Sequence, residues 1–131
     1  MGSLFSKKER KFSKNRLDNL YKYGQRIYGQ SLIIIWKYIE TDTLIPVQLL
    51  ISVPKKKIKK AVNRNYTKRI IREVYRLNKS HLINLFQRPI EVIIKYNKTS
   101  LPEFNKLETE LLHLLNHDSF KNTETSKKDF N

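Results

Sequence analysis

Residues 63–78 carry the pattern that most constrains the fold, because they match a helix with one apolar side and one cationic side. At about 100° per residue, one face presents a cation every four residues: Arg64, Lys68, Arg72 and Arg76. The opposite side presents the aliphatic residues of an expected core face: Ile70, Ile71, Val74 and Leu77. Like charges four residues apart oppose helix formation by about 0.2–0.5 kcal/mol per pair. A helix that repeats them is therefore expected to face a polyanion.

The segment before this helix adds to the same charge. Five lysines stand within residues 55–60 (KKKIKK), and the whole chain has a formal net charge of +15. Nucleic acid is the usual partner of such a chain, ahead of an anionic membrane surface or a merely solvated face. A solvated face would mix both signs, yet Glu73 is the only acid within residues 55–78. The pattern therefore favours phosphate binding.

Composition excludes several other classes of protein. The chain has no cysteine, which excludes disulfides, zinc–thiolate sites and a thiol nucleophile. The N-terminus lacks the apolar region of a secretion signal, and no apolar run reaches the roughly 18 residues of a membrane span. We therefore expect a cytoplasmic protein with no membrane partner.

Catalytic chemistry is poorly supported. His113 and His117 have the i, i+4 spacing of helical metal ligands, but no third ligand accompanies them. Three glycines cannot supply a glycine-rich phosphate loop, and the acids show no paired arrangement. The sequence predicts no catalytic residue and no firm metal site in the polypeptide itself.

Periodicity and turn residues predict six elements in the order α-β-β-α-β-α. These are a helix between the caps Ser13 and Gly24, strands at 31–40 and 45–53, a helix at 63–78 ending at Asn78, a strand at 90–96, and a helix from a capping box at 100–103 to Asn116. Residues 25–30 are expected to form a turn. The first two strands are expected to pair as an antiparallel hairpin around 41–43.

This order predicts an α+β fold, a small α-β sandwich with helices packed on a small sheet. Residues 13–116 form the single expected RNA-binding domain, between a flexible basic N-terminus at 1–12 and a disordered polar tail at 117–131. The strand–helix–strand segment would by default cross over with a right hand.

Aromatic residues offer a second candidate surface. Trp36 and Tyr38 fall on the same face of a strand, because side chains alternate. Exposed aromatics among basic residues are typical of single-stranded nucleic acid binding, where bases stack on rings. The alternative is that both side chains belong to the core.

Residues 61–76 (AVNRNYTKRIIREVYR) resemble the signature of the bacterial ribonuclease P protein family, Ala-Val-x-Arg-Asn-x-x-Lys-Arg-x-Ile-Arg-Glu-x-x-Arg. Ten positions match: Ala61, Val62, Arg64, Asn65, Lys68, Arg69, Ile71, Arg72, Glu73 and Arg76. The lysines at 55–57 and the stretch from Asp18 to Gly24 are similar to family segments as well. The resemblance covers about residues 7–116.

The resemblance implies the protein subunit of a ribonucleoprotein endonuclease that removes 5′ leaders from precursor tRNA. The RNA would carry catalysis and hold most of the Mg²⁺, and one protein copy would bind the catalytic RNA and the leader. The family also implies an unusual left-handed crossover in place of the default.

By the same resemblance, RNA contacts fall on the basic helix and the preceding loop: Lys55, Lys56, Lys57, Arg64, Asn65, Lys68, Arg69, Arg72 and Arg76. Asn65 would lie near RNA-held magnesium. The leader would lie in a cleft between the sheet and the first helix, with Leu17, Tyr21, Trp36 and Tyr38 as candidates. The chain departs from the family at Tyr66, where an arginine is expected.

Two other functions stay open from the sequence. A structural RNA-binding protein of the ribosome or its assembly would need the cations but no aromatic platform. A DNA-binding helix is less favoured, because a strand and a lysine-rich loop precede residue 63 where a helix-turn-helix needs another helix.

Overall fold

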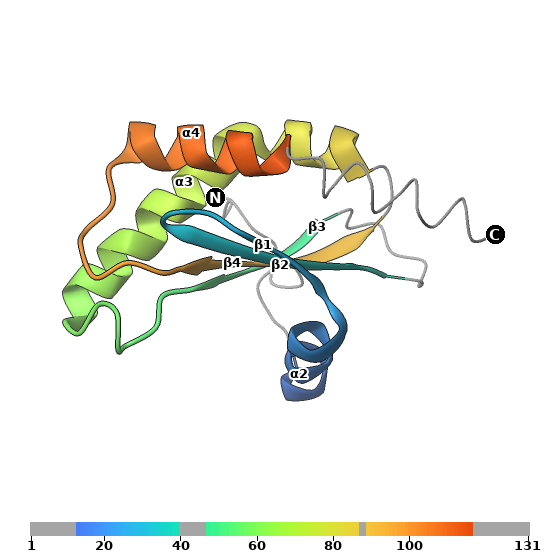
Figure 1. The fold of residues 1–131 in the computed structure, drawn as a ribbon, viewed down its shortest axis with the longest axis horizontal. Helices are drawn as coiled ribbons and strands as arrows, with labels where there is room; N and C mark the ends of the chain where they lie inside the picture. Colours follow the sequence, from blue (N-terminus) through green and yellow to red (C-terminus); the bar gives the residue numbers. More distant parts are fainter. Residues whose placement is uncertain (1–12, 40–46, 87–88, 117–131) are drawn as a thin grey trace, which may run out of the picture.

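The computed structural model describes residues 13–39, 47–86 and 89–116 (Figure 1). The described elements are α2 (Lys14–Tyr23), β1 (Gln25–Tyr28), β2 (Leu32–Tyr38), β3 (Val47–Ser52), α3 (Ala61–Phe86), β4 (Ile90–Tyr96) and α4 (Phe104–Leu115). Residues 1–12, 41–43 and 117–131, for which a flexible end, a turn and a disordered tail are predicted, lie outside the described residues.

The four strands form one mixed sheet in the order β1-β2-β4-β3. Strand β2 is antiparallel to both β1 and β4, whereas β3 is parallel to β4. Figure 1 shows α3 and α4 on one side of the sheet and α2 on the other. The predicted α+β class is confirmed, and α3 connects the two parallel strands; the handedness of that crossover stays a prediction.

Two details of the predicted sheet are wrong. Residues 25–28 form β1 rather than a turn; the strand is short and polar, with Ile27 as its only buried residue, so it gives almost no apolar signal. The predicted hairpin of β2 with β3 is also wrong, because β4 lies between them. Six of the seven residues of β4 are buried, which suits a central strand covered on both faces.

The main core lies between the sheet and the layer of α3 and α4. Strand β2 contributes alternate residues, and Ile71, Val74 and Tyr75 of α3 pack with them. Four leucines of α4 complete this core: Leu107, Leu111, Leu114 and Leu115. On the opposite face, Leu20 of α2 packs on Ile35 and Ile93 in a smaller cluster.

Helix α3 continues for 26 residues, past the predicted end at Asn78. Asn78 is not a cap, since its side-chain amide donates to the Val74 carbonyl (2.8 Å) and to Glu108 of α4 (2.9 Å). The prediction of Leu77 as a core residue is wrong as well, because its side chain is half exposed. Packing against α4 thus helps to decide which side of α3 is buried. It also stabilises the helix beyond Asn78, where the sequence predicts its end.

The predicted capping box at 100–103 is also wrong, because α4 begins at Phe104. Glu103 is its N-cap residue and makes no side-chain capping bond; it forms an ion pair with Lys106 instead (3.1 Å). The Ser100 carbonyl accepts a hydrogen bond from the Tyr96 hydroxyl (2.6 Å). This hydrogen bond from the end of β4 therefore holds Ser100 in a loop rather than in a helical turn.

Helix α2 has the predicted caps. The Ser13 side chain accepts a hydrogen bond from the Arg16 amide (3.1 Å), and Gly24 follows the last turn. Gly24 has an ordinary extended backbone with φ of −69°, but a Cβ there would lie 2.5 Å from the Leu20 carbonyl oxygen. Glycine is required because α2 turns directly onto the sheet.

An ion pair fixes the other end of α2. The Arg16 guanidinium donates from Nε to Glu91 of β4 (2.7 Å) and from Nη2 to Gln48 of β3 (2.6 Å), and it pairs with Glu91. Glu91 is only 8% exposed, so its charge depends on this partner.

We predict that Arg16→Met destabilises the protein, because it leaves the Glu91 carboxylate buried without this cation. The expected loss is about 1–3 kcal/mol, since the arginine itself is partly exposed. Chemical denaturation of Arg16→Met, Glu91→Gln and the double variant measures the coupling. A double variant that loses the sum of the two single losses would show that the pair does not act as a unit.

The single tryptophan provides a test of which face of β2 is buried. Trp36 is 1% exposed, so its fluorescence should resist acrylamide quenching in the native state and become quenchable in urea. Trp36→Ala should lower the free energy of unfolding by about 3–5 kcal/mol, as expected for a large core side chain. A native tryptophan that is quenched freely, or by stacking with single-stranded RNA, would contradict this arrangement.

Candidate nucleic-acid interface

One side of α3 is cationic and faces solvent beside the core. We name this surface the basic flank; its residues are Asn65, Lys68, Arg69, Arg72 and Arg76. Asn65, Arg69 and Arg76 are exposed, and Lys68 and Arg72 are half-buried. Burial of the neighbouring side at Thr67, Ile71 and Val74 fixes the rotation of the helix, so the flank is presented rigidly.

One member of the basic flank is partly neutralised. Arg76 donates to Glu73 through Nε (3.2 Å) and forms an ion pair with the same carboxylate. This hydrogen bond lowers the pKa of Glu73 and raises the pKa of Arg76, so both groups stay charged. A phosphate at Arg76 would have to compete with this partner.

The lysine loop, residues 55–60, leads from β3 into α3. Lys55, Lys56, Lys59 and Lys60 are exposed, whereas Ile58 is buried in the core. Arg64 holds the loop from the helix side, because its Nη1 donates to the carbonyls of Ile58 (3.1 Å) and Lys59 (2.8 Å). The predicted RNA contact Arg64 therefore has a structural role that the sequence did not show, and only the rest of its guanidinium is available for a phosphate.

On the other face of the sheet, α2 covers two of the three cross-strand rows of side chains. At one end, it bonds to the row of Lys37, Glu91 and Gln48: Arg16 contacts Glu91 and Gln48, and Asn19 accepts from Lys37. In the middle row, Leu20 packs on Ile35 and Ile93. The third row is left largely uncovered.

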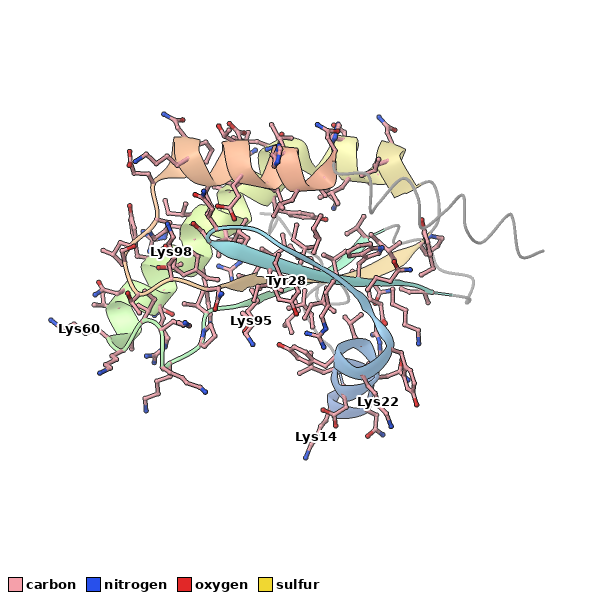
Figure 2. The ribbon with its side chains drawn as sticks, in the orientation of Figure 1. Lys14, Lys22, Tyr28, Lys60, Lys95 and Lys98 are labelled. Atoms are coloured by element: carbon pink, nitrogen blue, oxygen red, sulfur yellow. The ribbon has the colours of Figure 1, made fainter. Side chains whose placement is uncertain are left out.

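We name this third row the open row; its members are Tyr28, Ile33, Lys95 and Ser52, one from each strand in sheet order. They share a face because directly paired residues point to the same side. Tyr28 is 66% exposed, and the other three are half-buried. Figure 2 shows Lys95 pointing from the sheet toward the side on which α2 lies.

Tyr21 of α2 forms the wall of the open row. Its ring lies 5.6 Å from the Lys95 ammonium and 5.8 Å from the Arg26 guanidinium, measured to the ring centroid. Arg26 also donates to the Tyr21 carbonyl, which holds that cation beside α2. An aromatic surface and two cations thus converge beside an exposed tyrosine, which suits bases and phosphates together.

The structure sorts the predicted cleft residues into two groups. Tyr21 and Leu17 both pack partly buried against the cluster beneath α2, and the Tyr21 ring also lies beside Lys95 of the open row. Trp36 and Tyr38 do not reach this face: they are 1% and 6% exposed and lie in the core against α3 and α4. Their prediction as a stacking platform is wrong, because the strand register turns Ile33, Ile35 and Lys37 toward α2 instead.

The sequence does not predict that Tyr28, Arg26, Ile33 and Lys95 lie near Tyr21 on one face of the sheet. Tyr28 and Arg26 belong to β1, whose residues are predicted to form a turn. Lys95 is a lone cation in an apolar strand, and only the pairing with β2 places it opposite Ile33.

The departure at Tyr66 lies on the outer side of α3. Tyr66 is 41% exposed, and Val62, one turn earlier, is 70% exposed. Four other exposed positions surround them on the helix and the loop: Lys59, Lys60, Asn65 and Arg69. The ring is thus available to a partner where an arginine is absent.

In the described part of the chain, no three histidine or acidic side chains gather as a metal site. His113 lies exposed on α4, and His117 is outside the described residues. None of the described helices has the length and apolarity needed to cross a membrane.

The two candidate surfaces meet at one end of the sheet. Ser52 ends β3 and leads through Val53 and Pro54 into the lysine loop, so the open row runs toward the start of α3. Figure 2 shows Lys60, Lys95 and Lys98 toward this same end of the molecule. The arrangement can neutralise phosphates along both the open row and the basic flank, and it can stack bases on the open row.

Known proteins match this chain over most of its length. The Ribonuclease P family model matches residues 5–118. The ribonuclease P protein component of Porphyromonas gingivalis W83 is 34% identical over 107 residues, covering 79% of this chain and 77% of the relative. That of Aliivibrio salmonicida is 34% identical over 117 residues, covering 88% and 95%.

Solved structures share the fold. The ribonuclease P protein of Staphylococcus aureus superposes with a TM-score of 0.67 at 24% identity, covering 82% of this chain and 92% of that chain. The ribonuclease P protein of Thermotoga maritima gives a TM-score of 0.65 at 22% identity, covering 81% and 94%. With the family match over residues 5–118, these findings show that the chain belongs to the bacterial ribonuclease P protein family, whose members are the protein component of a tRNA-processing ribonucleoprotein endonuclease.

Proposed function

We propose that the protein binds the single-stranded 5′ leader of precursor tRNA along the open row, while the basic flank and the lysine loop bind the catalytic RNA. The observation that carries this proposal is a grouping of side chains: the Tyr21 ring lies 5.6 Å from the Lys95 ammonium, and Lys95 and Tyr28 pair with Ile33 in the open row. Membership of the family supplies the RNA partner, and these side chains offer stacking and charge to a single strand.

The chemistry of the cleft suits an unpaired strand better than a duplex. A base stacked on an aromatic ring contributes about 1–3 kcal/mol, and stacking requires that the base be free of its own helix. Lys95 and Arg26 lie close enough to the Tyr21 ring to meet the phosphates on either side of a stacked base. Recognition of this kind depends little on base identity.

Magnesium fits a role on the RNA side of the interface. Lys68, Arg69 and Arg72 dominate the basic flank and would repel a divalent cation held by the protein directly. Asn65 offers an uncharged amide among them and could bond to water around an ion held by RNA phosphates. Neutralising the phosphates nearby would lower the magnesium concentration that the RNA needs to fold and bind substrate.

Reconstitution tests the proposal. The protein is mixed with the ribonuclease P RNA of its own source at low magnesium, and cleavage of precursor tRNA is followed. The expected result is stimulation by the protein and tighter binding of precursor than of mature tRNA. Tight binding of all RNAs, with neither stimulation nor a preference for the leader, would leave only a general RNA-binding protein.

Tyr21→Ala and Lys95→Ala should weaken binding of precursor tRNA to the holoenzyme by roughly tenfold each, the equivalent of one stacked base or phosphate contact. Binding of mature tRNA should change little, because it has no leader. Lys14→Ala on the exposed side of α2 removes the same charge elsewhere and serves as the control. Equal losses for precursor and mature tRNA would place these residues outside a leader site.

Arg69→Ala should weaken binding of the catalytic RNA alone, with or without substrate. Loss of one phosphate contact should also reduce the slope of log affinity against log salt by about 1. The affinity of the protein for the RNA is measured across a salt series, with Lys14→Ala as the matched control. An unchanged slope would show that the exposed Arg69 does not neutralise a phosphate.

A further inference from the structure

A groove on the opposite side of β1 is not used by the surfaces described so far. It has a volume of about 890 Å³ and lies between the β1–β2 turn and α4. This is within the range of about 300–1,000 Å³ typical of pockets for small organic ligands, so it has room for a nucleobase with its sugar.

The groove is built by direct packing of the turn on α4. Glu110 accepts hydrogen bonds from the backbone amides of Ser31 and Leu32, each 2.8 Å long. A Cβ on Gly29 would approach the Glu110 carboxylate and lie 2.9 Å from Leu114, so a side chain there would displace both of these side chains. The Glu110 carboxylate is hydrogen-bonded to the turn and lines the groove together with its other residues.

Those other residues are cationic and polar. Lys98 enters from the loop after β4, and Lys106 and His113 come from α4, with Asn105 and Thr109 between them. Lys106 pairs with Glu103 at 3.1 Å, but both side chains are largely exposed, so this pair is weak. Buried Ile27 and Leu114 supply the apolar lining. An apolar lining among cations and hydrogen-bond donors suits a nucleotide, with its flat base and charged phosphate.

Tyr28 connects the groove with the open row. It is the last member of that row, on the edge strand β1, and it also lines the groove. Four strands spaced about 4.8 Å apart give the open row a length of about 14 Å from β3 to β1. An RNA strand that follows the open row away from the lysine loop would leave the sheet at Tyr28, where the groove begins. Figure 2 places Lys98 on the side of α3, across the sheet from Lys95.

We propose that this groove is a second leader subsite, which binds nucleotides further from the cleavage site after the leader has crossed the edge of the sheet at Tyr28. This inference rests on the proposed leader binding along the open row. Nucleotides near the cleavage site occupy the open row, and only a longer leader reaches Lys98 and His113.

The test uses the holoenzyme and a series of precursor tRNAs whose leaders lengthen one nucleotide at a time. For the wild-type protein, affinity should rise in two stages, first as the open row fills and then as the groove fills. Lys98→Ala and His113→Ala should bind short-leader precursors and mature tRNA normally. They should lose roughly tenfold in affinity only for long leaders, the equivalent of one stacking or phosphate contact.

Lys14→Ala is the control for loss of one exposed charge, and a thermal melt checks that the variants fold. Groove variants that match the wild type at every leader length would overturn the second subsite while leaving the first in place. Equal losses for mature tRNA would also overturn it, since the groove would then contact the catalytic RNA or the tRNA body. A wild-type affinity independent of leader length would instead refute leader binding itself.

Discussion

The arrangement of the exposed cationic and aromatic side chains depends on how α2 is held on the sheet. Arg16 reaches across from α2 to Glu91 and Gln48 at one end of the strands, and Leu20 fills the middle of the face over Ile35 and Ile93. A ten-residue helix held in this way can cover two cross-strand rows but not the third. The covered part of the sheet face therefore holds Lys37, Glu91 and Gln48 and the apolar pair Ile35 and Ile93, whereas the uncovered part holds Tyr28 and Lys95. The helix also brings Tyr21 to the edge of the uncovered row, where its ring contacts Lys95 and Arg26.

The second constraint is that three chain segments leave the sheet at the same end. Strand β3 leads into the lysine loop, β4 leads to Lys98, and the β1–β2 turn packs against α4. Cations from distant parts of the sequence thus gather without any of them lying inside the core. Helix α3 starts here, with its basic flank oriented by burial of Ile71 and Val74 on the adjoining side. A ribonuclease P protein needs two adjoining cationic surfaces of this kind if it is to contact a catalytic RNA and a substrate strand at the same time.

The sequence was sufficient for the fold class, the family, both caps of α2 and the residues of β4, because each depends on local patterns or on a long specific motif. The sequence was insufficient where the pairing of strands decides the order of the sheet and the side to which each residue points. β1 has too few apolar residues to stand out, and nothing local separates a β2–β3 hairpin from the observed order with β4 between them. The faces of β2 could not be assigned either, since both sides of LIIIWKY are apolar; Trp36 and Tyr38 therefore appeared available for stacking although they are core residues. Tyr28 and Lys95 come to lie in one row only through that same pairing.

Site-specific photo-crosslinking tests whether the leader follows the open row. A photoreactive amino acid replaces either Tyr28, on the open row, or Tyr23, which is similarly exposed (62%) but lies near Lys37 at the other end of the sheet. Each holoenzyme is irradiated with precursor tRNA labelled at its 5′ end. We expect crosslinks to the leader from position 28 and none from position 23. Crosslinks from position 23 alone, or equally from both, would contradict it.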